Sequence, residues 1–253
     1  VVTEHFSKMH GNKISKNDLI LASVAYSNSS SLISVSNSLS KAIKQNTGYD
    51  SIVVPNIADT FVFKPKKIFH NEKFIFITAG RLIPEKGVDV VIQAFARIKN
   101  TSVELKILGD GPQKPALKKL ARKLNVSSRV HFYGKYRREQ FNKELNESDC
   151  FILTSKKETF GVVYAEAMLT GTPIIATKCG GPEDFITDSI GKLVDVDNIE
   201  ETKEAMEAMI KDSNFYNPDV IYKSAIDLFS HDIVAEKLES IYTDVLNAEE
   251  GEQ

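Results

Sequence analysis

The sequence is poor in cysteine, in long apolar runs and in excess charge of either sign. Cys150 and Cys179 are the two cysteines among 253 residues, which fits a reducing compartment better than a disulfide framework. No apolar run approaches the roughly 18 residues that a membrane-spanning helix needs. The net charge is −2, so the composition gives no reason to expect a nucleic acid or another polyanion as a partner.

Hydrophobic residues make up 42% of the chain, enough for one large domain or two smaller ones. The first part alternates strand and helix, with Ser15 and Ser36 as the expected helix N-caps. Strands are expected at 1–3, 32–35 and 52–55, and helices at 15–29 and 36–45. These strands are too few to close a domain, and the chain opens at a strand end. We therefore expect the N-terminal part of this domain to be missing.

Residues 63–73 are polar and basic and contain Pro65, which is typical of a linker. Beyond them, strands of near-continuous hydrophobicity alternate with helices, which indicates a parallel sheet covered on both faces. The expected strands are 74–79, 103–108, 130–133, 150–154, 173–176 and 192–194. The expected helices are 88–98, 114–123, 138–148, 162–169, 183–186, 200–210, 219–229 and 231–246.

The predicted fold class is therefore α/β, with the chain divided into four parts. A partial first domain spans 1–62, a linker 63–73, a second domain 74–229, and a closing helix with its tail 230–253. The acidic residues 248–253 are expected to fray.

The most informative stretch follows the apolar strand predicted at 150–154. Glu158 is expected in the loop at the carboxyl end of this strand, and Glu166 one turn into the next helix, eight positions later. Between them, Phe160, Gly161 and Val162 are expected to form the helix N-terminus, where backbone N–H groups and the helix dipole favour an anion. Two carboxylates that face one crevice can accept hydrogen bonds from the neighbouring hydroxyls of a ribose or a hexose.

A second candidate site follows the strand predicted at 74–79. Gly80 permits a tight turn, Arg81 supplies a fork of donors, Lys86 supplies a point charge, and Gly87 precedes a helix. Two cations beside a helix N-terminus suit a pyrophosphate. From these residues alone, a charged surface loop remains an equal alternative.

The spacing of Glu158 and Glu166 resembles the Glu-x7-Glu signature of retaining glycosyltransferases of family four, which have the GT-B fold. Residues 80–87 resemble the family's Gly-Arg-Leu…Lys-Gly motif, and residues 109–112 its Gly-x-Gly-Pro turn. Gly180-Gly181-Pro182-Glu183 is similar to its Gly-Gly-x-x-Glu turn, with Glu183 one position early and a cleft-shaping role expected. Ile57 departs from the family's usual Pro-Asn-Gly.

The resemblance implies a role for each matching residue of the donor site. Glu158 would meet the donor sugar and Glu166 the nucleotide ribose, while Arg81 and Lys86 would hold the donor's phosphates. Gly80 and the helix N-terminus at 160–162 would approach the same ligand with their backbones.

Three further residues are weaker candidates. Lys135 and Tyr136 follow the strand at 130–133 and would lie beside the nucleobase. His5 follows the first strand, where many family members carry a His near the transferred sugar; a surface His is an equal alternative.

The fold that the resemblance implies is a Rossmann-like, parallel-sheet domain that binds a nucleotide-sugar, with a partial N-terminal Rossmann-like domain. The activity would be sugar transfer from a UDP- or GDP-linked donor to a glycan or lipid-linked acceptor, with retention of configuration. Neither a cofactor nor a metal is expected, and no Cys/His cluster has zinc spacing. No side chain stands out as a nucleophile, so the substrate phosphate would assist the incoming hydroxyl.

We expect a cytoplasmic enzyme of cell-envelope or polysaccharide biosynthesis. Peripheral contact with the inner face of the membrane stays open, although the basic helix at 114–123 fits a solvated face better. The alternatives are a GT-B nucleotide-sugar epimerase and a fragment that binds the donor without transferring it. A dinucleotide-dependent oxidoreductase is disfavoured because no third Gly follows residues 109–112. The base, sugar, acceptor and oligomeric state stay open.

Overall fold

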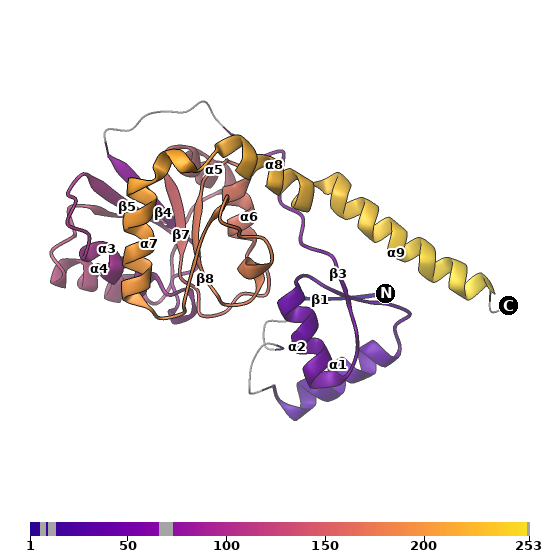
Figure 1. Ribbon diagram of the computed structural model, residues 1–253. Helices are drawn as coiled ribbons and strands as arrows, with labels where there is room; N and C mark the ends of the chain where they lie inside the picture. The colour runs from indigo at the N-terminus through magenta and orange to yellow at the C-terminus, as the bar shows by residue number, and fades with distance from the viewer. Residues whose placement is uncertain (6–8, 10–13, 66–72, 252–253) are drawn as a thin grey trace.

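The computed structural model describes residues 1–5, 9, 14–65 and 73–251, and its chain forms two α/β units (Figure 1). Each unit is built on a parallel sheet, as the alternation of strands and helices predicts. Most of the expected linker and the last two residues of the expected frayed tail lie outside the described residues.

The first unit has a three-stranded sheet in the order β1-β2-β3. Its elements are β1 (Val2–Glu4), α1 (Lys16–Ser27), β2 (Leu32–Ser34), α2 (Asn37–Thr47) and β3 (Ile52–Val53). The two predicted caps are confirmed: Ser15 Oγ accepts a hydrogen bond from Asp18 N, and Ser36 Oγ accepts one from Leu39 N, each at 3.0 Å.

The second unit has a six-stranded parallel sheet in the order β6-β5-β4-β7-β8-β9. The strands are β4 (Phe74–Ala79), β5 (Val103–Leu108), β6 (Val130–Gly134), β7 (Cys150–Leu153), β8 (Ile174–Thr177) and β9 (Gly191–Val194). The chain runs outward from β4 to β6, returns to β7 on the other side of β4, and runs outward again. The strand order therefore reverses between β4 and β7, and ligands of such sheets bind at the carboxyl ends of the strands at this point.

Helices cover both faces of this sheet (Figure 1). On one side α3 packs against α4 and α7, and on the other α6 packs against α5 and α8. The helical segments are η2 (Pro84–Lys86), α3 (Val88–Ala96), α4 (Lys114–Lys123), α5 (Arg138–Asn146), α6 (Val162–Met168), η3 (Gly181–Asp184), α7 (Ile199–Lys211), η4 (Ser213–Phe215), α8 (Pro218–Phe229) and α9 (His231–Gly251).

Two local predictions are wrong. The helix expected at 183–186 is instead the 3₁₀ segment η3, because Pro182 and two glycines start a tight turn there. The tail expected to fray from residue 248 continues as helix α9 to Gly251.

The last helix returns to the first unit. Val234 and Ile241 of α9 form a small apolar cluster with Ile33 of β2 and Val54. Phe63, at the start of the expected linker, is fully buried and packs edge-on against Phe141 of the second unit. The first contact holds α9 against the first unit, and the second holds the connecting segment against the second unit. None of the described helices is both long enough and apolar enough to span a bilayer.

Candidate functional site

The loops that follow β4 and β7 interlock through their backbones. Thr154 Oγ1 donates to Gly87 O at 2.7 Å, and Lys156 N donates to Glu85 O at 2.8 Å. Gly87 has φ +62°, and a Cβ at this position would lie 2.0 Å from Thr154 O. Only glycine fits there, so the two loops form one surface at the switch point of the sheet.

This packing brings Lys86 against Glu158. Lys86 Nζ lies 2.6 Å from Glu158 Oε1, and Ser155 Oγ donates to the same oxygen at 2.7 Å. The Glu158 side chain is 10% exposed and that of Lys86 25%, so this ion pair is better shielded from water than a surface pair. Among the described residues, no hydrogen bond to Glu158 Oε2 is found, which leaves that oxygen open to a ligand.

Glu166 is the second carboxylate, on the inner side of α6. Its Oε1 accepts a hydrogen bond from Arg138 Nη2 at 3.1 Å, and Arg138 Nη1 donates to Asp59 Oδ2 at 3.0 Å. Burial raises the pKa of Glu166, the Arg138 guanidinium opposes this, and Asp59 adds a smaller rise. Within the part of the chain that the structure describes, Glu166 Oε2 has no hydrogen-bond partner.

Tyr136 belongs to the same group. Its ring packs on Phe141 at 5.3 Å between centroids, and its pKa is raised to about 12, first by burial and then by the charge of Glu166. The phenol therefore stays protonated at neutral pH and can act as a hydrogen-bond donor. Lys135, beside it, is exposed.

Arg81 lies on the neighbouring loop and is exposed, with no side-chain partner among the described residues. Gly80 abuts the turn after β5, since a Cβ on Gly109 would lie 1.9 Å from Gly80 O. Leu82 N donates to Asp110 O at 2.9 Å. The Gly-x-Gly turn at 109–111 thus supports the Arg81 loop, which agrees with the structural role expected for it. The structure does not pair Arg81 with Lys86.

The other predicted site residues have no side-chain hydrogen bond to Lys86, Glu158 or Glu166 among the described residues. The Phe160 side chain is buried against Phe185 and Phe229, so only its backbone can face a ligand. Gly161 has φ +87° and Val162 begins α6, a helix of seven residues. His5 is exposed just beyond β1 and has no hydrogen bond to any described residue of this site.

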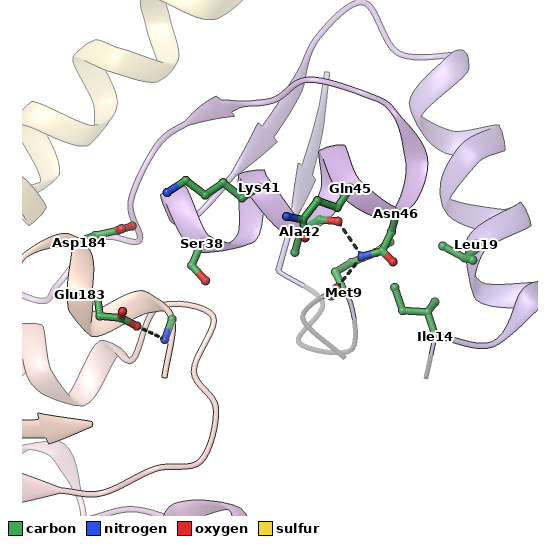
Figure 2. Close-up of a pocket in the computed structure, with 11 residues that line it drawn as sticks. Met9, Ile14, Leu19, Ser38, Lys41, Ala42, Gln45, Asn46, Glu183 and Asp184 are labelled. Atoms are coloured by element: carbon green, nitrogen blue, oxygen red, sulfur yellow. Dashed lines mark hydrogen bonds between the residues drawn. The ribbon is translucent and has the colours of Figure 1, made fainter. Parts of the chain in front are cut away.

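A cavity of about 590 Å³ lies between the two units, beside the Glu158 loop (Figure 2). Its lining includes Ser38, Lys41 and Gln45 of α2 on one side and Glu183 and Asp184 of η3 on the other. In Figure 2 Lys41 extends from α2 toward the side of η3.

Backbone hydrogen bonds join this cavity to the carboxylate site. Glu158 N donates to Cys179 O at 3.1 Å, and Gly181 N donates to Glu158 O at 3.0 Å. Glu183 shapes the wall as the sequence predicts, because its Oε2 accepts from Gly180 N at 2.7 Å. Asp184 Oδ2 accepts from Asn37 N at 2.7 Å, across the two units and at the start of α2.

The Cys179 thiol lies near the Glu158–Lys86 pair. Its pKa is raised to about 11, mainly by burial, with smaller rises from Glu158 and Glu183. A thiol with this pKa is a poor nucleophile near neutral pH. Within the described residues, no group of three or more His, Cys, Asp or Glu side chains could hold a metal ion.

Sequence reasoning missed Arg138, Ser155, Asp59 and the cavity residues of α2. Ser155 lies only three positions before Glu158, but the other contacts join positions far apart in the chain, such as the 28 positions between Arg138 and Glu166 and the 147 between Asn37 and Asp184. No local spacing signals such contacts.

Residues 59–223 match the family Glycosyl transferases group 1. The chain belongs to this glycosyltransferase family. It is 34% identical over 184 residues to N-acetyl-alpha-D-glucosaminyl L-malate synthase of Bacillus anthracis, covering 71% of this chain and 47% of that protein. It is 34% identical over 141 residues to the lipopolysaccharide core biosynthesis glycosyltransferase LpsE of Rhizobium meliloti, covering 55% of this chain and 40% of LpsE. The chain thus spans less than half the length of either relative.

Solved structures of two glycosyltransferase-fold proteins share its architecture. Sucrose-phosphate synthase from Thermosynechococcus elongatus superposes with a TM-score of 0.87 at 20% identity, covering 97% of this chain and 67% of that one. HepE of Anabaena, in complex with UDP and glucose, superposes with a TM-score of 0.84 at 21% identity, covering 96% of this chain and 71% of HepE. At these identities the likeness shows the fold alone, and it confirms the predicted GT-B architecture. The comparisons give no support to the epimerase alternative.

Proposed function

We propose that this glycosyltransferase-family protein moves a sugar from a UDP- or GDP-linked donor to a glycan or lipid-linked acceptor, with retention of anomeric configuration. The observation that carries the proposal is that the Lys86–Glu158 pair joins the loops after β4 and β7, at the switch point of the larger sheet, and that Glu166 lies on α6, the helix that follows the β7 loop. Each carboxylate there has one oxygen bonded to a protein cation and a second oxygen available to a ligand.

In this proposal Glu166 binds the ribose. Its free oxygen can accept hydrogen bonds from the neighbouring 2′ and 3′ hydroxyls, and burial strengthens such bonds. Tyr136 and Lys135, on the loop after β6, lie beside the nucleobase. The nearness of Tyr136 to the Glu166 charge supports this placement, because base and ribose are adjacent in a nucleotide.

The diphosphate lies between Lys86 and Arg81. An ammonium carries three N–H donors, so Lys86 can keep its bond to Glu158 and still donate to a phosphate oxygen. The Arg81 guanidinium, which bonds to no side chain in the described part of the protein, can donate to the second phosphate. Gly80 and the backbone at 160–162 allow close approach, and the predicted donor site thus needs neither metal nor cofactor.

The donor sugar points toward the cavity between the units, where Glu158 binds its hydroxyls and His5 approaches from the first unit. The acceptor enters this cavity past α2. Its hydroxyl oxygen bonds to the anomeric carbon on the face from which the diphosphate leaves. The sugar–phosphate bond breaks, the leaving phosphate oxygen takes the hydroxyl proton, and the two cations stabilise the diphosphate charge.

We place this activity in the cytoplasm, in cell-envelope or polysaccharide biosynthesis, with the inner face of the membrane as a peripheral contact. The function of LpsE in lipopolysaccharide core biosynthesis supports this context.

A thermal-shift panel tests the donor site first. UDP, GDP and ADP, free and sugar-linked, are each added at increasing concentration. A bound ligand at ~100 times its Kd should stabilise the fold by about 2.7 kcal/mol. If none of the six raises the melting temperature, the proposal fails. If a donor binds but no sugar reaches any acceptor in a product assay, the chain is a donor-binding fragment.

A further inference from the structure

Arg138 is a residue of the carboxylate site that no motif anticipated. It starts helix α5, yet its guanidinium reaches two carboxylates on other elements. Nη2 lies 3.1 Å from Glu166 Oε1 on α6, and Nη1 lies 3.0 Å from Asp59 Oδ2 on the segment that connects the two sheets.

The Asp59 end of this bridge is fixed to the connecting segment. Asp59 Oδ1 accepts hydrogen bonds from Phe61 N at 3.0 Å and Val62 N at 3.1 Å, which close a turn. Ala58 N, one residue earlier, donates to Phe229 O at 3.0 Å. The Arg138 guanidinium also stacks 5.5 Å from the centroid of the buried Phe63 ring. Arg138 is therefore oriented by the connecting segment and not only by its own helix.

Glu166, the second carboxylate that Arg138 contacts, is buried, and the Arg138 guanidinium stabilises its negative charge. The Glu166 side chain is 10% exposed, and the titratable groups that face it are the charged Arg138 and Asp59 and the neutral phenol of Tyr136. Burial and Asp59 favour the neutral acid, and Arg138 alone of these favours the carboxylate. A carboxylate accepts from two ribose hydroxyls, whereas the neutral acid loses one acceptor oxygen.

We propose that Arg138 is a positioning residue that keeps Glu166 charged and oriented for the ribose and links this contact to the segment connecting the two sheets. This inference rests on the proposed ribose role of Glu166. Arg138 uses Glu166 Oε1 and leaves Oε2 to the nucleotide, so it supports the ligand instead of competing with it. Asp59 sets the direction of the guanidinium fork, and the ribose contact thereby depends on how the two units are connected.

Calorimetric titration of wild-type protein and four variants with UDP, GDP and ADP tests this link, between about pH 5.5 and pH 8.5. R138Q should weaken the best-bound nucleotide about tenfold near pH 7, a loss expected for one charge-assisted contact. As the pH is lowered, the affinity of R138Q should begin to fall at a higher pH than the affinity of the wild type does, because Glu166 protonates more readily without the Arg138 charge. R138K keeps the charge but not the fork, so it should retain the wild-type pH profile with intermediate affinity.

Two further variants separate positioning from general damage. D59N retains an oxygen for the Phe61 and Val62 amides and removes the charge that orients Arg138, so it should weaken binding although Asp59 itself touches no nucleotide. R137Q removes a neighbouring exposed cation and should bind as the wild type does. Melting temperatures identify any variant that fails to fold, and R138K replaces R138Q in that case.

The outcomes are distinguishable. Wild-type protein that binds none of the three nucleotides overturns the proposed function, and the inference falls with it. Wild-type binding with unchanged affinity and pH profile in R138Q overturns the inference alone. Tighter binding in R138Q also overturns it, because Arg138 would then compete with the nucleotide for Glu166.

Discussion

Lys86 Nζ lies 2.6 Å from Glu158 Oε1, although 72 positions separate the two residues in the chain. The contact forms because the loops after β4 and β7 pack backbone to backbone at Gly87, where no side chain fits. Ser155 holds the same Glu158 oxygen. Two motifs that look independent in the sequence therefore form one charged site, and no described residue forms a hydrogen bond to the second oxygen of Glu158.

Arg81 tests whether this site binds phosphate. R81A should weaken nucleoside diphosphate binding by roughly 1.5–3 kcal/mol, the range for hydrogen bonds to a charged group, and should leave binding of the matching nucleoside nearly unchanged. Calorimetry with both ligands measures the two effects. R122A removes an exposed arginine of α4 and serves as the matched control. Equal loss for diphosphate and nucleoside would show that Arg81 does not contact phosphate.

The buried Glu166 should make the stability of the fold depend on pH. Burial raises the pKa of Glu166 in the folded state above its unfolded value. Between these two pKa values, the folded protein therefore binds more protons than the unfolded chain does. The free energy of unfolding should then fall as pH rises through this window, by about 1.4 kcal/mol per unit of pKa difference. E166Q has no such carboxyl and should lack the decline.

Urea unfolding of wild type and E166Q at several pH values between about 4 and 7.5 measures this difference. Wild-type stability should drop relative to E166Q toward neutral pH. If wild type instead gains stability over E166Q as pH rises, the Arg138 bridge outweighs burial, and Glu166 has a lowered pKa in the fold.

Cys179 should resist alkylation in the folded protein. Because its pKa is raised to about 11, very little thiolate exists near pH 8, and iodoacetamide should react much more slowly than with the unfolded chain. Mass spectrometry of the peptide that contains Cys179 follows the reaction. Cys150 is fully buried and should also be protected, so it provides an internal comparison. Rapid alkylation of Cys179 alone would show that its thiolate is stabilised.

Nucleotide binding should survive EDTA. Arg81, Lys86 and backbone N–H groups supply positive charge and donors for the diphosphate, and the described residues contain no group of three ligands for a metal. Titrations with EDTA and with added Mg²⁺ or Mn²⁺ should give the same affinity within about twofold. A strict requirement for either ion would contradict this account of charge neutralisation.

Much of the second unit could be predicted because its signals are local. β4 and β5 have the predicted bounds, since each is an apolar-rich run that ends at a glycine. The cap at Ser36 follows in the same way from a polar residue before an amphipathic run. The carboxyl-end placement of Glu158 and Lys86 follows from strand–loop–helix order.

Long-range contacts could not be predicted from such patterns. The Asp59–Arg138–Glu166 bridge joins three segments, and an arginine at the start of a helix looks like any solvated residue. The 3₁₀ turn at η3 replaced the predicted helix because Gly181 packs against the backbone of another loop: a Cβ on Gly181 would lie 2.4 Å from Phe160 Cα. Tertiary contacts, not helix propensity, decide the conformation there.

The assignment of separate roles to Glu166 and Glu158 is the central claim. Calorimetry of E166A and E158A with a nucleoside diphosphate and with its sugar-linked form tests it most directly. E166A should weaken both ligands, by about 1.5–3 kcal/mol each, because both carry the ribose. E158A should weaken only the sugar-linked ligand, since Lys86 remains available to the diphosphate once its partner is gone. The reverse pattern would exchange the two roles, and unchanged affinity for both ligands in both variants would contradict the account.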